Sequence, residues 1–262
     1  MRSASLFWGA ALVILGGLFL LGNLGIIKVD VWGVIWPTAL ILLGIWLLWG
    51  RLFRRGPSSE HASVPLEGAT RAQVRLSHGA GRLMISTGAG GVDLVEGDFD
   101  GGLDLRTRRQ DDLLEAELRS PVRGWSFWDW GGRGLEWNVR FNPQVPLTLK
   151  LETGASESIL DLGDLLVGDL SLQTGASSTE LILPACAVYT RVKVSGGAAS
   201  FKVRVPPGVA ASNCFSGGLA SLDVDRQRFP PSGNLYQSPD FAFAENKVEL
   251  IFEVGAASVE VR

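Results

Sequence analysis

Three segments between residues 149 and 205 repeat one short pattern: LKLETGASESILDL (149–162), LSLQTGASSTELIL (170–183) and VKVSGGAASFKVRV (192–205). When Gly154, Gly175 and Gly197 are aligned as position zero, each segment has an apolar residue at minus three and an aliphatic residue at plus six. Small residues occupy plus one and plus two. The same pattern fits three further places, centred on Gly79, Gly218 and Gly255. Six matches indicate an internal repeat.

The repeat has a period typical of stacked architectures, because the central glycines from Gly154 to Gly218 follow each other at steps of 21, 22 and 21 residues. Apolar and polar residues alternate on both sides of each glycine, as Leu170 and Leu172 show before Gly175. This alternation is the two-residue period of a half-buried strand, so each unit is expected to be strand, corner, strand. We expect the corner glycines to supply backbone angles that other residues resist, and the small residue after each to keep the corner narrow.

The pattern therefore predicts an all-β domain, a β-solenoid of strand-Gly-Ala-strand repeats of about 21 residues in which each coil buries its aliphatic side chains on the next. The last unit, VELIFEVGAASVEV (248–261), is expected to close the stack. An antiparallel meander of hairpins is the alternative, because a Gly-Ala corner can also be a two-residue hairpin turn.

Two uncharged runs precede this domain, at residues 3–27 and 31–50. A helix needs about 20 apolar residues to cross a bilayer core, and both runs are long enough. We predict a transmembrane helical hairpin over residues 1–52, with spans at about 5–25 and 31–50, in contact with the lipid bilayer. A cleaved signal peptide is the rival interpretation of the first run, but no small-x-small cleavage site follows it.

Arginines predict the orientation of this hairpin. Arg2 precedes the first span and three arginines follow the second, whereas the link between the spans carries one lysine and one aspartate. Positively charged flanks stay in the cytoplasm, so both termini and the β domain are predicted to be cytoplasmic. The three arginines that follow the second span are Arg51, Arg54 and Arg55.

The rest of the chain divides by composition. Residues 53–65 form a polar linker, residues 66–147 the N-terminal part of the β domain with an aromatic hairpin, and residues 148–262 the C-terminal repeats. One strand of the hairpin is expected to place Trp137 and Val139 in the core. The other has aromatic residues on both faces, so it either caps the stack or contacts a partner or the membrane. These aromatic residues are Trp125, Phe127, Trp128 and Trp130.

The composition excludes several functions. A net charge of −3 and the lack of a basic stripe argue against nucleic-acid binding. Cys186 and Cys214 do not resemble a disulfide or metal framework, and we expect two small buried thiols. His78 has no partner in a metal-binding spacing, so a surface or corner histidine is expected.

Acidic residues do not form a recognisable site either. The acidic stretch at 93–100 resembles a calcium-binding coil, but no second acidic repeat follows in register, so solvated side chains are favoured. Asp161, Asp164 and Asp169 crowd one connection and Asp223 and Asp225 another, without recurring at one position of adjacent coils as a catalytic row would. The sequence therefore predicts no catalytic residue, no cofactor and no metal.

Two sets of motifs resemble a known family. The two-span segment, with Leu-Gly-Gly-Leu and Leu-Leu-Gly-Ile-Trp stretches, resembles the LiaI/LiaF-type transmembrane region. The remainder, from EGATRAQVRLSHGAG (67–81) through NPQVPLTLKLETGAS (142–156) to the C-terminus, resembles the toast-rack and LiaF-like domains of bacterial envelope-stress proteins. The resemblance implies a membrane-bound regulator of a two-component sensor histidine kinase that responds to cell-wall damage.

Other functions stay open from the sequence. A structural scaffold, an adhesin-like protein or, with less support, a polysaccharide-active enzyme would be compatible with a β-solenoid. Open solenoids can also associate end to end, which would make the protein a homo-oligomer.

Overall fold

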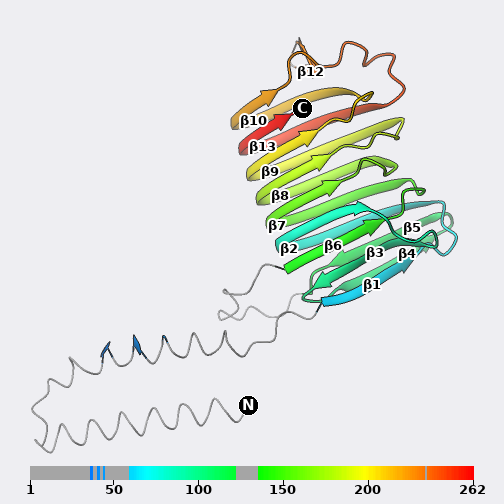
Figure 1. Ribbon diagram of the computed structural model, residues 1–262, viewed down its shortest axis with the longest axis vertical. Coiled ribbons are helices and arrows are strands. Elements are labelled where there is room, and N and C mark those ends of the chain that lie inside the picture. The colour runs from blue at the N-terminus through cyan, green and yellow to red at the C-terminus, as the bar shows by residue number, and fades with distance from the viewer. Residues whose placement is uncertain (1–35, 38–39, 42–43, 45–58, 122–134, 234) are drawn as a thin grey trace, which may run out of the picture. The chain divides into compact units, whose positions relative to one another are not determined.

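The computed structural model describes residues 36–37, 40–41, 44, 59–121, 135–233 and 235–262. Residues 57–262 form one compact unit, and it contains all thirteen strands of the described chain (Figure 1). Six of the strands have 15 to 17 residues. They are β2 (Arg71–Thr87), β7 (Leu147–Asp161), β8 (Val167–Ile182), β9 (Tyr189–Arg204), β10 (Ala210–Val224) and β13 (Lys247–Val261).

Each long strand is bent at its central glycine. In β7, buried and exposed side chains alternate up to Thr153, and then Gly154 and Ala155 are both exposed before the alternation resumes at buried Ser156. Adjacent side chains of a straight strand point to opposite faces, so two exposed residues in a row shift the alternation by one. The central glycine divides each long strand into a first arm before it and a second arm after it. The shift keeps the apolar side chains of both arms on the inner side of the bend. It recurs in β2, β8, β9 and β13 at the matching glycine.

The bend lets each unit close into a coil. A straight strand of 15 residues would span about 50 Å, whereas the connection from β7 to β8, residues 162–166, can reach only about 20 Å. The backbone N–H of Leu147, at the start of β7, nevertheless donates to the carbonyl of Leu166 at 2.8 Å. The two ends of the bent strand are therefore close together. The arms enclose a fully buried aliphatic layer that includes Leu149, Leu160 and Leu165.

Neighbouring coils pair in parallel and in register. The corner residues Thr153 and Ala155 of β7 face Thr174 and Ala176 of β8, and the same alignment continues into β9. Parallel pairing excludes the antiparallel hairpin alternative for these long strands. The predicted all-β class and the repeating strand-corner-strand unit are confirmed.

The order of coils differs from the order along the chain. The sheet runs β2-β7-β8-β9-β13-β10, so the C-terminal strand lies between β9 and β10 instead of closing the stack. The expectation that the last unit is terminal is wrong. Strand β13 buries apolar side chains along both arms and therefore needs a neighbour on each side. Strand β10 has Asn213 at a buried position. The side-chain amide of Asn213 donates to the backbone carbonyl of Tyr236, in a short hairpin that follows β10 in the chain.

That hairpin, β11 (Pro231–Ser232) and β12 (Leu235–Gln237), covers part of the first arm of β10. It belongs to the long connection from β10 to β13. The stack therefore ends in an atypical coil, as is usual for repeat folds.

At the other end, the two arms of β2 continue into separate groups of short strands. The first arm pairs with β5 (Leu113–Arg119), which pairs with β4 (Asp104–Gln110). The second arm pairs with β6 (Leu135–Phe141), followed by β3 (Asp93–Asp100) and β1 (Ser59–Pro65). The expected core face of β6 is confirmed, with Trp137 and Val139 fully buried. The acidic stretch 93–100 is strand β3 and not a loop.

The N-terminal part is described at residues 36–37, 40–41 and 44, which are helical. The predicted spans at about 5–25 and 31–50 lie almost wholly outside the described residues. Among the residues that are described, no helix is long and apolar enough to cross a membrane.

Candidate interaction surface

The corner glycines form a column along one edge of the stack. None of them has a positive φ, so our expectation that they supply unusual backbone angles is wrong. Their role is close approach, because an added Cβ atom would point at the backbone of the neighbouring coil. The distance from the ideal Cβ position to the carbonyl oxygen of the adjacent corner glycine is 2.3 Å at Gly154, 3.0 Å at Gly175, 3.2 Å at Gly197, 2.9 Å at Gly255 and 3.6 Å at Gly218.

The strands on either side of the aromatic segment, residues 122–134, end and begin beside Gly79, the first glycine of the column. Trp125, Phe127, Trp128 and Trp130 lie outside the described residues. The strands that flank them are placed: β5 ends with Arg119 opposite Ser77, and β6 begins with Leu135 opposite Gly81. Both ends of the segment are therefore attached beside the corner of β2. The arginines predicted to set topology, Arg2, Arg51, Arg54 and Arg55, also lie outside the described residues.

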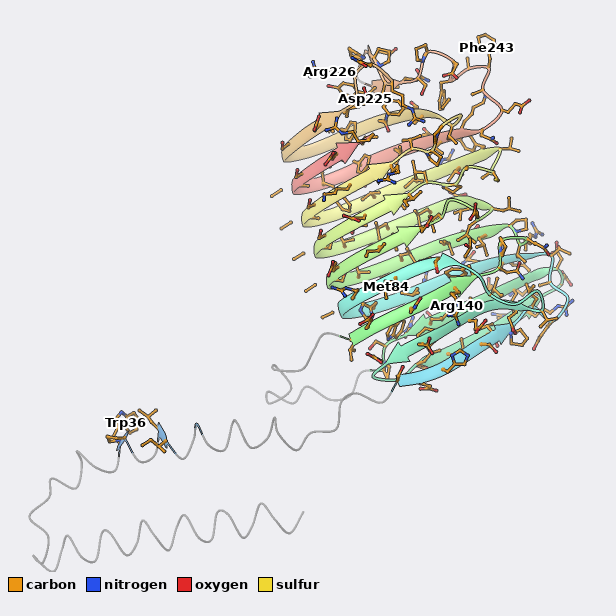
Figure 2. All side chains as sticks on the ribbon, viewed as in Figure 1. Trp36, Met84, Arg140, Asp225, Arg226 and Phe243 are labelled. Atoms are coloured by element: carbon orange, nitrogen blue, oxygen red, sulfur yellow. The ribbon has the colours of Figure 1, made fainter. Side chains whose placement is uncertain are left out.

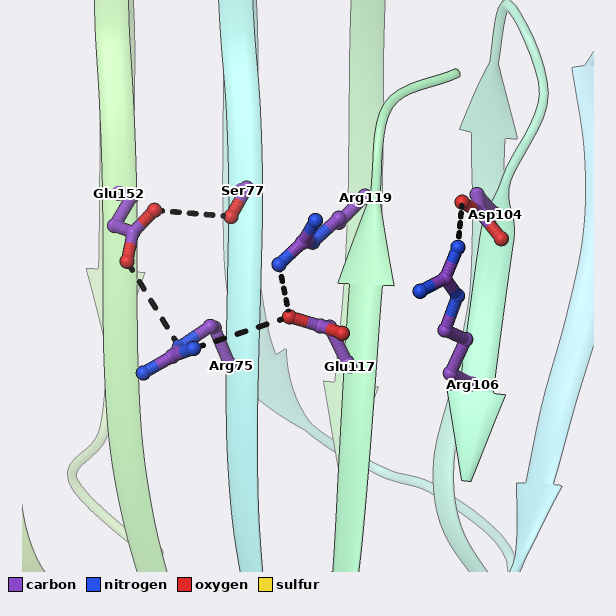
Figure 3. A network of polar contacts seen from close by, with 7 residues as sticks. All are labelled: Arg75, Ser77, Asp104, Arg106, Glu117, Arg119 and Glu152. Carbon is purple, nitrogen blue, oxygen red and sulfur yellow. Dashed lines mark hydrogen bonds and ion pairs between the residues drawn. The ribbon is translucent and has the colours of Figure 1, made fainter. Parts of the chain in front are cut away.

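The outer face of the first coils carries a network of opposite charges (Figure 3). Arg75 lies between Glu117 and Glu152, at 3.9 and 3.8 Å, and the Ser77 hydroxyl donates to Glu152 at 3.2 Å. Arg119 pairs with Glu117 as well. On the second arm, Arg82 contacts Glu157 at 2.9 Å. These pairs are at least partly exposed, so each contributes little to stability.

Several of the described carboxylates form close contacts with basic side chains. A hydrogen bond from Arg71 lowers the pKa of Asp112, and a hydrogen bond to Glu157 raises the pKa of Arg82. Arg140 binds Glu96 at 2.7 Å, and His61 binds Asp98 at 2.9 Å. Two residues of the acidic stretch are thus held by neighbouring side chains. No group of three or more potential metal ligands occurs in the described part of the chain.

Three of the five aspartates at the connections have structural partners. The Asp161 carboxylate accepts from the backbone of Gly163 at 3.1 Å, and the Asp225 carboxylate accepts from the backbone of Gln227 at 3.0 Å. Asp223 pairs with Arg262 at 2.5 Å. Such bonds cap turns and strand ends and occupy these three carboxylates.

Two further expectations about polar residues are corrected. His78 is at a corner, as expected, but it is 1% exposed and not at the surface. Cys186 is exposed and Cys214 half-buried, so neither is the buried thiol we expected. Both cysteines are free.

Exposed apolar side chains gather where β9 and β13 begin. Val188 is 75% exposed and Phe243 93% exposed, and Phe243 points away from the end of the stack in Figure 2. Lys247 connects the two segments, since its backbone N–H donates to Val188 and its ammonium donates to Ala242. No sequence pattern had indicated this pair, because the connections lack periodicity.

The second arm of β10 forms an open edge. It pairs with β13 on one side, while β12 pairs only with residues 212–214 of the first arm. On its other side, residues 218–224 have no strand partner among the thirteen described strands. Unpaired strand edges are potential pairing sites for another chain.

Comparisons with known proteins agree with this architecture. Residues 54–204 match the family model of the N-terminal domain of toast_rack, and residues 6–48 match that of the LiaI-LiaF-like transmembrane region. No curated protein gives a significant sequence match.

Two solved structures match this chain to different degrees. The first is a candidate cell adhesion protein from Clostridium sporogenes ATCC 15579, with 22% identity and a TM-score of 0.71, covering 78% of this chain and 98% of its own. This likeness shows a shared fold. The second is a candidate adhesin from Bacteroides fragilis NCTC 9343, with 8% identity and a TM-score of 0.30, covering 80% of this chain and 100% of its own. That score is too low to indicate a shared fold.

Proposed function

Because the chain belongs to the toast-rack family and carries a LiaI-LiaF-like transmembrane region, we propose that it is a non-enzymatic regulator that modulates a membrane-bound sensor histidine kinase in the cell-envelope stress response. The membrane segment holds the β domain at the bilayer. The stack of coils presents a rigid surface to the kinase.

One observation carries this proposal: the aromatic segment is attached at both ends beside the corner of β2. Tryptophan is enriched among residues that dominate interface energy. The coil that bears the segment is also the repeat closest in sequence to the membrane segment, since β1 begins at Ser59 and the transmembrane match ends at residue 48. In our proposal, Trp125, Trp128 or Trp130 contacts the kinase or the adjacent leaflet of the bilayer.

The charge environment favours a binding role over catalysis. Among the aspartates at the connections, Asp161 and Asp225 cap turns and Asp223 pairs with Arg262. General acid-base catalysis needs carboxyl groups that can reach a substrate and exchange protons. We therefore favour a regulator over a polysaccharide-active enzyme.

The proposal includes a topology. Arg2, Arg51, Arg54 and Arg55 flank the expected spans, so both termini and the β domain would be cytoplasmic. A kinase domain would then be accessible on the same side of the membrane. A periplasmic or extracellular β domain would instead limit contacts to the sensor part of the kinase.

The alternative function is a scaffold or adhesin-like protein that assembles through strand edges. It is favoured by the open second arm of β10, residues 218–224. The candidate cell adhesion protein from Clostridium sporogenes has the same fold, and an adhesion role for this chain is proposed only as this alternative. A scaffold would form homo-oligomers without a kinase.

Photo-cross-linking in native membranes tests the proposal. A photoreactive amino acid at Trp128 of the full-length protein should capture a histidine kinase, and the same probe at Lys202, which is exposed on β9, should not. Changing the tryptophans of the segment to serine should weaken the capture and alter the transcriptional response to wall-targeting antibiotics. Capture of only further copies of this chain would support the scaffold, and an unaltered antibiotic response would contradict regulation.

A further inference from the structure

A group of hydroxyl side chains interrupts the aliphatic core at the corners of β7 and β8. The inward positions at minus one, plus two and plus four from the glycine are Thr153, Ser156 and Ser158 in β7, and Thr174, Ser177 and Thr179 in β8. The two sets are adjacent, because each residue of β7 faces its counterpart in β8. In β13 the same positions are occupied by Val254, Ala257 and Val259.

Most of these hydroxyl groups are buried without a protein partner. Ser156 and Ser158 bond to each other at 3.3 Å. The buried side-chain oxygens of Thr153, Thr174 and Thr179 have no hydrogen-bond partner among the described residues. The Ser177 oxygen is in the same state, although the residue is half-buried. Buried polar groups are almost always hydrogen-bonded in native proteins, so four in one place point to a ligand.

His78 extends the group into the next coil. It faces Thr153 across the β2-β7 ladder, and neither ring nitrogen has a hydrogen-bond partner in the described chain. Burial lowers its pKa to about 4, and the nearby backbone of Leu135 offsets a part of the decrease without meeting hydrogen-bond geometry. The ring is therefore neutral at neutral pH and can both donate and accept.

Aromatic rings close the group at both ends. The His78 ring lies 5.1 Å from that of Trp137, which is fully buried. At the other end Gly196 takes the place of threonine in β9. A Cβ atom there would lie 3.0 Å from the Thr174 hydroxyl and 3.2 Å from the ring of Phe201. The Phe201 ring thus occupies the space that a side chain at 196 would need.

We propose that the corner of β2, β7 and β8 binds a short chain of ordered water molecules inside the domain, bonded to His78, Thr153, Thr174, Ser177 and Thr179. Water fits the chemistry of this polar corner, because hydroxyls and a neutral imidazole offer both donors and acceptors. The inward side chains of the polar corner carry no charge, and an ion buried without a counter-charge is strongly disfavoured. Internal waters typically make about three hydrogen bonds to such otherwise unpaired groups.

A high-resolution crystal structure of the full-length protein tests the proposal directly. We expect ordered solvent density within about 3 Å of the Thr174 and Thr179 oxygens and of one His78 nitrogen. No density between these groups, or density whose short contacts and dependence on sodium or potassium identify a cation, would overturn the proposal.

Isosteric variants supply a second measurement. Thr179→Val removes a hydroxyl but keeps the volume, and if water is bound it should raise the unfolding equilibrium constant about tenfold while the nearest water disappears from the density. If the corner is dry, the same variant should instead be more stable than the wild type. Thr190→Val is the matched control, because the Thr190 hydroxyl donates to the Val167 carbonyl at 2.7 Å. That variant should lose stability without changing density at the corner.

Discussion

Replacement of Gly154 by alanine should separate two coils that the wild type holds in contact. The ideal Cβ position on Gly154 lies 2.3 Å from the carbonyl oxygen of Gly79, whereas ordinary contacts begin at 3.4 Å. The neighbouring backbones would have to move apart by about 1 Å, and a hydrogen bond of about 2.9 Å lengthened by this amount is lost.

The expected loss follows from these contacts. Losing the two ladder hydrogen bonds nearest the corner costs about 2 kcal/mol, and overpacking of a rigid neighbour costs a further 1 to 3 kcal/mol, roughly. Alanine restricts the unfolded chain more than glycine does, and this entropic effect reduces the destabilisation by about 0.4 to 1 kcal/mol. The net destabilisation of Gly154→Ala should therefore be about 3 kcal/mol.

Gly218→Ala is the matched control. Its Cβ would lie 3.6 Å from the Gly255 carbonyl, an ordinary contact, so only the entropic gain of about 0.4 to 1 kcal/mol should be measured. Gly175→Ala, at 3.0 Å, should fall between the two. Urea unfolding of the full-length variants in detergent, followed by circular dichroism, measures the series. Equal effects at Gly154 and Gly218 would refute close approach as the reason for these glycines.

Three further predictions address the core, the buried histidine and the topology. Leu181→Ala should cost about 2 to 5 kcal/mol in urea unfolding because Leu181 is buried, while Lys202→Val, on the exposed face, should change stability by less than about 0.5 kcal/mol. His78 has a folded pKa of about 4 against 6.5 in the unfolded chain, so the unfolded state binds a proton first as pH falls. The free energy of unfolding present above pH 6.5 should drop by about 3 kcal/mol on acidification to pH 4. The His78→Gln variant should lack this part of the pH dependence. A pH profile of the variant equal to that of the wild type would contradict burial of the neutral ring. A reporter fused after Arg262 should be active in the cytoplasm, and activity on the outer side of the membrane would reverse the predicted orientation.

Local pattern explains why the repeat could be predicted. Alternation of side chains is a property of a single strand, so the burial of Leu151, Leu160 and Leu181 follows from their spacing to the nearest glycine. The hydroxyl positions were also visible in the aligned repeats, but spacing alone does not distinguish a buried threonine from an exposed one. The exposed pair Val188 and Phe243 had no signal, because it lies in connections without periodicity.

Local patterns in the sequence were sufficient to predict the repeat, its inward positions, the all-β class and the resemblance to the toast-rack family. The identity of neighbouring coils depends on long-range packing, because the six units share one pattern and any two could pair. The tertiary structure places β13 between β9 and β10, where both apolar arms are covered. The structure also shows that the corner glycines are needed for close approach and not for unusual backbone angles. The approach of Gly154 to the Gly79 carbonyl is a contact between residues 75 positions apart in the chain, so no local pattern could predict it.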